Sequence, residues 1–246
     1  LAKKMIEADE IGEIRHARFT YLQDWLVDPE FPMNWRLRKD AAGSGAHGDL
    51  GAHSIDLARY LVGEVAEVVG MKETFIKERP AEGTSSGLTA TAGEGVEEVT
   101  VDDYSTFLAK FSNGARATFE ATRLAPGRKN FNRFEINGSK GTLCWCFEDL
   151  NCLDFYSVAD APHAMGFRRI IATEGVHPYA GSWWPPGHML GYDHGFANAA
   201  ADLVSYIAQD KACDPCFLDG ARCVAVLEAV DASIESGRWS EVEQID

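Results

Sequence analysis

The chain has 246 residues, more than the roughly 100 to 200 that one domain usually holds, so we expect one large domain or one domain with part of another. Hydrophobic residues make up 46% and charged residues 25%, an ordinary globular composition that argues against a disordered, collagen-like or coiled-coil chain. The 38 acidic residues outnumber the 23 basic ones, and the net charge of −15 disfavours non-specific binding to nucleic acid or to anionic membranes.

Two further features of the composition bear on location and chemistry. No apolar run approaches the roughly 18 residues that cross a bilayer, and no signal-peptide pattern is visible, so we expect a soluble, cytoplasmic protein without a membrane partner. The six cysteines are too few for a disulfide scaffold, and Cys213 and Cys216 form a lone C-x-x-C without the second ligand pair of a structural zinc site. We therefore expect reduced thiols and no bound metal.

The first residues have the pattern of a helix without a beginning. Leu1, Met5 and Ile6 share one side of an amphipathic stretch, but no N-cap residue precedes it. We expect residues 1–12 to be the remnant of a helix that links to a dinucleotide-binding domain upstream, and residues 13–246 to form the main domain. On this interpretation the chain is a fragment.

Strand and helix patterns then follow in chain order. Residues 14–25 are rich in β-branched and aromatic side chains, which favours a strand, and residues 28–51 have the proline and glycine punctuation of a loop. Apolar residues at helical spacing predict a short helix over residues 54–62, ended by Gly63. A strand is expected over residues 65–76.

The middle of the chain predicts further strands. Residues 77–98 are polar and rich in glycine, threonine and serine, and we expect them to be mobile or disordered. Two alternating runs between residues 102 and 122 flank Asn113-Gly114, a pair that supplies the positive φ of a tight hairpin turn. The remaining strands, expected as a meander, are residues 132–136, 142–147, 151–157 and 167–173.

Two amphipathic helices close the chain, over residues 193–209 and over residues 219–236, the second capped by Gly237. The sum is an α+β fold: one large, open, mostly antiparallel sheet with helices on one face. The other face of such a sheet would need a partner, so we expect a homo-oligomer that forms through the open sheet.

Residues 43–48 match the G-x-G-x-x-G pattern of dinucleotide-binding loops. Such a loop must follow a buried apolar strand and open a βαβ unit, but the mostly charged residues 36–40 precede this one and no βαβ repeat follows. We expect a small-residue loop that lets backbone pass close to a ligand or a neighbouring element, and no nucleotide site in this chain.

The candidate catalytic residues are Asp49 and His53. A spacing of four puts both side chains on one side of a helical turn, so that they can face one pocket. An imidazole that titrates near neutral pH, beside a carboxylate that orients it, is suited to act as a general base. A helix-capping aspartate and a histidine that satisfies it would give the same spacing, so the pair alone is weak evidence.

The longer string around this pair is more specific. Residues 43–63 read GSGAHGDLGAHSIDLARYLVG and are preceded by Trp35-Arg36. This string resembles a signature of the C-terminal domain of the Gfo/Idh/MocA oxidoreductases, the family of glucose–fructose oxidoreductase and inositol dehydrogenase. The likeness extends to the opening residues 2–13 and to the closing helix, and so spans nearly the whole chain. One departure is His47, where a leucine-like residue is usual; it could line the pocket.

The resemblance implies a two-domain enzyme of which this chain is one part. It implies an N-terminal Rossmann domain that binds NAD or NADP and holds the family's lysine, both lacking here, and a C-terminal domain that binds substrate and builds oligomers. By position, Asp49 and His53 match the family's active-site pair, with His53 as acceptor of the substrate hydroxyl proton. We therefore expect the substrate-binding and dimerisation part of an NAD(P)-dependent sugar or cyclitol dehydrogenase, inactive alone and without its own cofactor.

Four further residues are candidates for substrate binding. Gln23 ends the first strand, where it can bond sugar hydroxyls, and Trp35 with Arg36 can cover the nicotinamide edge or the substrate. His188 lies in a loop rich in aromatic and histidine residues, as many carbohydrate pockets are. Each also has a structural interpretation, as a solvated strand end, a packing stack or a packed corner.

Two other functions stay open. Asp49 and His53 could bind a metal ion together with His188 or His194, in a metal-dependent sugar hydrolase or isomerase. A non-catalytic oligomerisation module is the third possibility.

Overall fold

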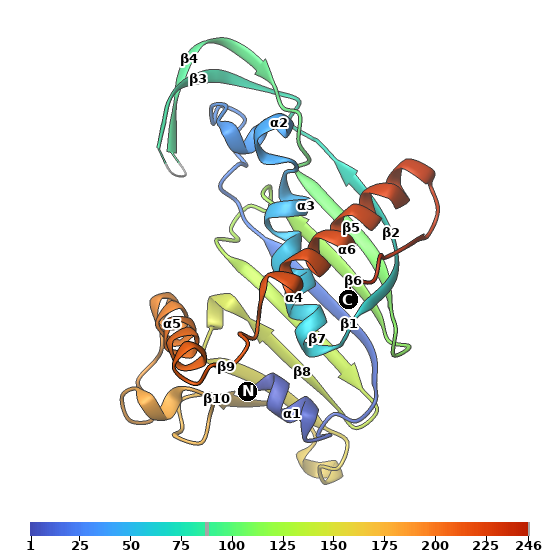
Figure 1. The fold of residues 1–246 in the computed structure, drawn as a ribbon, viewed down its shortest axis with the longest axis vertical. Coiled ribbons are helices and arrows are strands. Elements are labelled where there is room, and N and C mark those ends of the chain that lie inside the picture. The colour runs from blue at the N-terminus through green and yellow to red at the C-terminus, as the bar shows by residue number, and fades with distance from the viewer. Residues whose placement is uncertain (87–88, 246) are drawn as a thin grey trace.

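One nine-stranded sheet organises the computed structural model, which describes residues 1–86 and 89–245 (Figure 1). Its strands lie in the order β10-β9-β8-β7-β1-β6-β5-β2-β11. In chain order they are β1 (Ile14–Leu22), β2 (Val65–Glu73), β5 (Tyr104–Phe111), β6 (Arg116–Thr122), β7 (Phe131–Gly138), β8 (Gly141–Cys146), β9 (Cys152–Ser157), β10 (Arg168–Ile171) and β11 (Ser240–Glu241). The expected large, mostly antiparallel sheet is confirmed.

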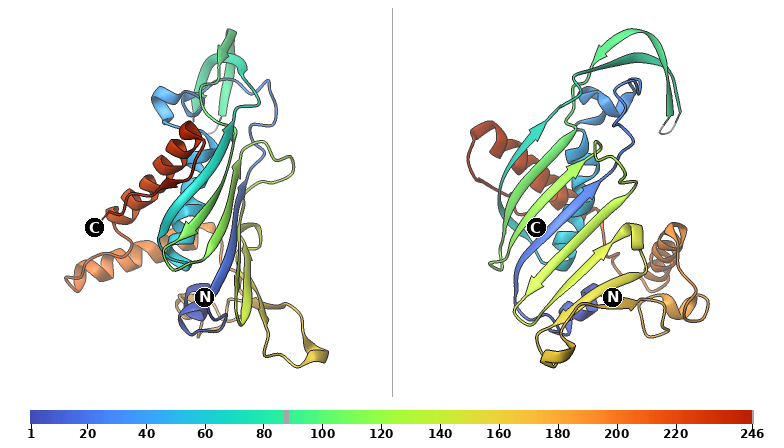
Figure 2. Two further views of the ribbon diagram at one scale, coloured as in Figure 1. Left: turned by 90° about the vertical axis from the view of Figure 1, so that its right-hand side faces the viewer. Right: turned by 180° about the vertical axis from the view of Figure 1, so that it is seen from behind.

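Helices cover one face of this sheet. They are α1 (Ala2–Glu7), α2 (Lys39–Ala42), α3 (Ala46–Asp49), α4 (Gly51–Leu61), α5 (Tyr192–Ala208) and α6 (Phe217–Ser236), with short 3-10 turns that include η1 (Trp35–Leu37). The edge-on view of Figure 2 shows α4 and α6 on the same side of the sheet, so the expected α+β arrangement is confirmed. Among the described residues, no helix is long and apolar enough to cross a membrane.

The core lies between the helices and the central strands. In β5 and in most of β6 every second side chain is buried, as expected for strands with one covered face. On that face the Phe119 ring stacks between Phe107 and Phe19, with ring centroids 4.3 and 5.1 Å apart. Stacked aromatic pairs of this kind contribute about 0.5–1.5 kcal/mol beyond their buried area. Cross-strand stacking thus helps to hold the central strands in register.

The four strands expected as a meander pair in chain order, β7-β8-β9-β10, so that prediction is confirmed. β1 lies in the centre of the sheet, between β6 and β7, a position that the strand patterns did not predict. It pairs antiparallel with β7 and parallel with β6, and at its end Leu22 lies opposite Phe131 and Thr122. Because parallel neighbours end at the same edge of a sheet, the segments that follow β1 and β6 lie side by side. The expected hairpin of β5 and β6 is confirmed, with Gly114 at a φ of 95°.

The segment expected to be mobile or disordered forms a hairpin instead. Strands β3 (Glu78–Ser86) and β4 (Thr89–Glu98) pair antiparallel, while residues 87–88 between them lie outside the described residues. Figure 1 shows this hairpin projecting beyond one end of the main sheet. The prediction was wrong because polar composition indicates exposure to solvent, and an exposed hairpin has the same composition as a disordered loop.

Two arginines attach the hairpin to the rest of the chain. Arg79 is fully buried and donates to the backbone carbonyl oxygens of Leu26, Asp28 and Phe31, at 2.7, 2.7 and 3.2 Å. Arg38, in the connection before α2, binds the carboxylates of Glu82 and Glu97 at 2.6 and 2.7 Å. These partners are distant in the sequence, so no local pattern indicates them.

Candidate active site

Asp49 and His53 lie where α3 meets α4, against the end of β1. The segment expected as a loop over residues 28–51 therefore contains short helices, and the helix that carries His53 begins earlier than residue 54. Only Leu50 separates the two helices, and its φ and ψ of −91° and −38° are helical, so the helical spacing of the pair is preserved. Both side chains approach Tyr21 of β1: the ring centroids of His53 and Tyr21 are 5.6 Å apart, and the charge of Asp49 acts on the Tyr21 phenol.

Asp49 is bound by a buried arginine and not by His53. Nη2 of Arg123 donates to Oδ2 of Asp49 at 2.7 Å; the Arg123 side chain is 2% exposed and that of Asp49 is 47% exposed. Within the described residues Asp49 and His53 form no hydrogen bond or ion pair with each other. A carboxylate that receives a charge-assisted bond from a rigid guanidinium is held in one orientation, which is the role that Arg123 has here.

Arg123 reaches this position because of the parallel strand pair. It is the first residue after β6, and Gln23 is the first residue after β1, so the two lie at the same sheet edge. The guanidinium carbon of Arg123 lies 5.6 Å from the ring centroid of Trp25. The site therefore lies at the carboxyl ends of two parallel neighbours, a pairing that the strand patterns did not predict.

A chain of hydrogen bonds runs from Trp25 to Tyr21. The Trp25 indole N–H donates to Oε1 of Gln23 at 3.0 Å, and Nε2 of Gln23 donates to Oδ1 of Asn130 at 3.4 Å. The Tyr21 hydroxyl donates to the same Oδ1 at 2.5 Å. Partial burial, followed by the negative charge of Asp49, raises the pKa of Tyr21 above its ordinary value, so the phenol is a hydrogen-bond donor at neutral pH.

These contacts join seven side chains into one cluster around the end of β1. The sequence indicated three of them, Asp49, His53 and Gln23. It missed four, and these are Tyr21, Trp25, Arg123 and Asn130. Asn130 lies opposite Gln23 where the β1–β7 pairing continues beyond Leu22 and Phe131, and this register is a property of the fold that no local pattern indicates. The cluster, which we call the β1 site, is open to solvent at His53, whose side chain is exposed.

The glycine-rich loop before α3 holds a carboxylate of the protein itself. The backbone N–H groups of Gly45 and His47 donate to the two carboxylate oxygens of Asp102 at 2.9 and 2.6 Å. A Cβ atom on Gly45 would lie 1.8 Å from the Asp102 carbonyl oxygen, so only glycine allows this approach. An anion of the protein thus takes the place that a nucleotide phosphate would need, and the loop does not fit a dinucleotide.

His47 lies in the core and does not line the β1 site, so that expectation is wrong. Its ring nitrogens contact Oγ of Ser105 at 2.9 Å and the carbonyl oxygen of Leu227 at 3.2 Å. The residue is 1% exposed, and this burial lowers the pKa of the imidazole below its ordinary value. The histidine is therefore neutral in the folded protein, as a packing residue that joins α3 to β5 and α6.

We expect His47 to make the fold less stable in mild acid. The pKa of His47 is lower in the folded protein than in the unfolded chain, where it is about 6.5. Above pH 6.5 the free energy of unfolding therefore keeps the full contribution of His47. As the pH falls below 6.5, the free energy of unfolding drops by up to about 1.4 kcal/mol per pH unit. Urea unfolding at pH 7.5 and pH 5 measures the loss, and His47→Gln, which stays neutral, should reduce it. An equal pH dependence in both proteins would contradict this origin.

Three predicted binding residues lie outside the β1 site. Trp35 is 49% exposed on η1, and the guanidinium of Arg36 stacks over its ring at 4.3 Å. His188 is exposed; its Nδ1 lies 2.7 Å from the carbonyl oxygen of Pro185 and its ring stacks on Trp184. The structure does not bring these three into contact with Asp49 or His53, and their role in binding stays a prediction.

A metal site is not assembled from the predicted residues. Within residues 1–86 and 89–245, no three His, Cys, Asp or Glu side chains are arranged to hold a metal ion. The set of Asp49 and His53 with His188 or His194 is accordingly not brought together.

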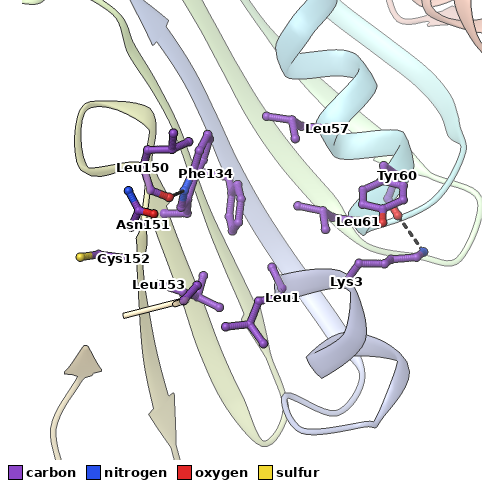
Figure 3. Close-up of a pocket in the computed structure, with 13 residues that line it drawn as sticks. Leu1, Lys3, Leu57, Tyr60, Leu61, Phe134, Leu150, Asn151, Cys152 and Leu153 are labelled. Atoms are coloured by element: carbon purple, nitrogen blue, oxygen red, sulfur yellow. Dashed lines mark hydrogen bonds between the residues drawn. The ribbon is translucent and has the colours of Figure 1, made fainter. Parts of the chain in front are cut away.

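An apolar cavity lies further along α4, away from the titratable side chains of the β1 site. It has a volume of about 240 Å³, and Figure 3 shows Leu57 and Leu61 of α4 facing Phe134 and Leu153 of the sheet across it. At its rim Nζ of Lys3 donates to the backbone carbonyl oxygen of Tyr60 at 2.7 Å. A cavity lined this way offers few groups that could bind or react with a polar ligand.

Comparisons with known proteins agree with the fold. Residues 1–144 match the GFO/IDH/MocA C-terminal domain. The whole chain is 40% identical over 249 residues to levoglucosan dehydrogenase of Pseudarthrobacter phenanthrenivorans and spans 64% of that protein's length. The remaining part of the relative has no counterpart in this chain.

Solved structures give the same result. An oxidoreductase domain protein from Kribbella flavida matches with a TM-score of 0.92 and 53% identity, over 99% of this chain and 63% of that one. Levoglucosan dehydrogenase in complex with NADH and levoglucosan matches with a TM-score of 0.91 and 39% identity, over 100% of this chain and 63% of that one.

Proposed function

The chain belongs to the GFO/IDH/MocA family, and from that premise we propose that it is the substrate-binding part of a dehydrogenase that oxidises a secondary hydroxyl of a sugar or cyclitol. The observation that carries the proposal is the β1 site, in which an exposed imidazole and an oriented carboxylate share one polar surface. We further propose that a region outside this chain binds NAD or NADP, and that the chain alone is inactive.

The proposed chemistry assigns one task to each side chain. Oxidation of an alcohol needs a base for the hydroxyl proton, while a nicotinamide, when bound, accepts the hydride from the same carbon. His53 is the proposed base, since within the described part of the chain no residue hydrogen-bonds its ring. Asp49, held by Arg123, is proposed to bind a neighbouring hydroxyl, and Gln23 another. Trp35, Arg36 and His188 are proposed to contact the substrate when the rest of the protein is present.

The test is turnover by the whole protein that contains this chain. Reduction of NAD and of NADP would be followed with levoglucosan, glucose and inositol, the first chosen because it is the substrate named for a 40% identical relative. Turnover of a sugar or cyclitol with either cofactor is the expected result. Failure to reduce both cofactors with all three compounds, in a folded protein, would contradict the proposal.

We propose that the uncovered face of the sheet forms a homo-oligomer. On this face Leu108 is 49% exposed among polar neighbours such as Arg18, whose Nη1 binds Oε1 of Glu135 at 2.8 Å. Light scattering at micromolar concentration should therefore give at least twice the mass of one chain, and Leu108→Asp should lower it. A monomer in the unmodified protein would contradict the proposal.

A further inference from the structure

The hydrogen bonds within the β1 site have a direction that begins at Trp25. An indole N–H can only donate, so Gln23 must turn its carbonyl oxygen towards Trp25. Gln23 then directs its donor Nε2 towards Asn130, so the acceptor on Asn130 must be Oδ1. The orientation of both amides is therefore a chemical consequence of one donor-only group.

The Tyr21 hydroxyl reinforces this direction. It donates to the same Oδ1 of Asn130, as a phenol, which carries its proton at neutral pH, is able to do. With Oδ1 engaged twice, Nδ2 of Asn130 has no partner among the described residues, and it is not among the buried polar atoms that lack one. The amide N–H₂ group of Asn130 is thus open to a ligand.

Trp25 can orient the two amides because packing on several sides fixes its ring. Its ring meets the edge of Phe31 at a centroid distance of 5.4 Å, and it packs against the buried cluster that contains Leu26 and Leu37. The guanidinium of Arg123 covers it. The indole N–H is therefore held in one position by the hydrophobic core.

The free N–H₂ group lies on the same side of the sheet as His53. Side chains alternate along a strand, so Tyr21 and Gln23 share the face of the buried Phe19. Asn130 shares the face of the buried Phe134 on the neighbouring strand, by the same alternation. This is the face that α4 covers, and α4 carries His53.

We propose that Asn130 is a specificity-determining residue that donates, through Nδ2, to a substrate oxygen that can only accept hydrogen bonds, such as an ether or carbonyl oxygen. Trp25 and Gln23 are positioning residues that hold the amide in this orientation. The identity of the reacting hydroxyl at His53 rests on the proposed function, whereas the orientation of Asn130 does not. A donor at this point, more than an acceptor in the same place, favours substrates with an ether or carbonyl oxygen there. A hydroxyl can rotate to face either a donor or an acceptor, whereas an ether oxygen can face only a donor.

The first test is N130D in the whole protein. Aspartate keeps the shape of the side chain and the bonds from Tyr21 and Gln23, but it replaces the N–H₂ donor by an acceptor. We expect kcat/KM for 1,6-anhydroglucose, whose 1,6-bridging oxygen only accepts where glucose carries hydroxyls, to fall about tenfold more than kcat/KM for glucose. Q209E, the same amide-to-carboxylate change at an exposed residue directly after α5, should leave the ratio unchanged. Equal losses for the two sugars in N130D would overturn the proposal.

The second test reads the amide orientation without turnover. In the whole protein labelled with ¹⁵N-asparagine, Q23E removes the donor that faces Asn130, so Asn130 must turn Nδ2 inward and its side-chain N–H₂ signals should shift. W25F keeps a ring against Arg123, adds no charge and removes the donor, so it should also shift these signals. Unchanged signals in both variants would overturn the proposal. Absence of turnover with every sugar would instead contradict the proposed function, and these signals would still decide the orientation.

Discussion

Replacing His53 by alanine in the whole protein is expected to lower kcat by about 10²–10⁴-fold, the usual contribution of a positioned general base. The imidazole lies against Tyr21 at the mouth of the β1 site, exposed to an incoming hydroxyl. Because the side chain is exposed, its loss leaves no buried group unpaired, and the free energy of unfolding should change by less than about 0.5 kcal/mol. A large loss of rate with little loss of stability is therefore the expected signature.

The measurement is steady-state turnover with NAD or NADP, beside urea unfolding of the same preparations. H163A removes another exposed imidazole, on a 3-10 turn between β9 and β10, and serves as the matched control. Asp49→Asn should act differently, because it weakens the bond from Arg123 and so raises KM as well as lowering kcat. A kcat for H53A close to that of H163A would exclude His53 as the base.

Replacing Arg79 by alanine is expected to destabilise the fold by about 3–5 kcal/mol, the largest effect on stability that we expect. The side chain is fully buried, and its guanidinium donates to three backbone carbonyl oxygens in the segment of residues 26–31. Alanine leaves these acceptors without partners and opens a cavity, and hydrogen bonds from charged groups contribute about 1.5–3 kcal/mol each. The β3–β4 hairpin should lose its attachment at the same time.

Urea unfolding measures the loss, and hydrogen exchange of the backbone amides in β3 and β4 locates it. R38A is the matched control, because Arg38 binds the same hairpin through Glu82 and Glu97 but is 28% exposed. Exposed ion pairs contribute about 1 kcal/mol or less, so R38A should have a much smaller effect than R79A. Similar losses in the two variants would show that burial of Arg79 is not the cause.

Local patterns sufficed for most helices and strands. Asn113-Gly114 predicted the turn between β5 and β6, and Gly237 ends α6 with a φ of 65°. Such signals act over two to four residues, where backbone sterics decide the conformation. The same short range explains why Asp49 and His53 could be proposed as a pair, since helical geometry alone brings residues four apart to one side.

Longer-range contacts account for the errors. The hairpin of β3 and β4 depends on Arg79 and Arg38, whose partners lie elsewhere in the chain. His47 and His53 are both histidines in neighbouring short helices, but His47 is buried against Ser105 and Leu227 whereas His53 is exposed. No periodicity distinguishes a histidine that enters the core from one that faces a ligand.

The sequence by itself determined the α+β class, the hairpin turn, the closing helices and the position of Asp49 and His53 one helical turn apart, because each follows from conformational preferences of neighbouring residues. Only the tertiary structure decided where β1 lies in the sheet, and with that the parallel pairing of β1 with β6 that brings Gln23 beside Arg123 and Asn130. Strand pairing depends on hydrogen bonds and buried area summed over the whole sheet, and these are properties of the complete fold that a short stretch of residues does not carry.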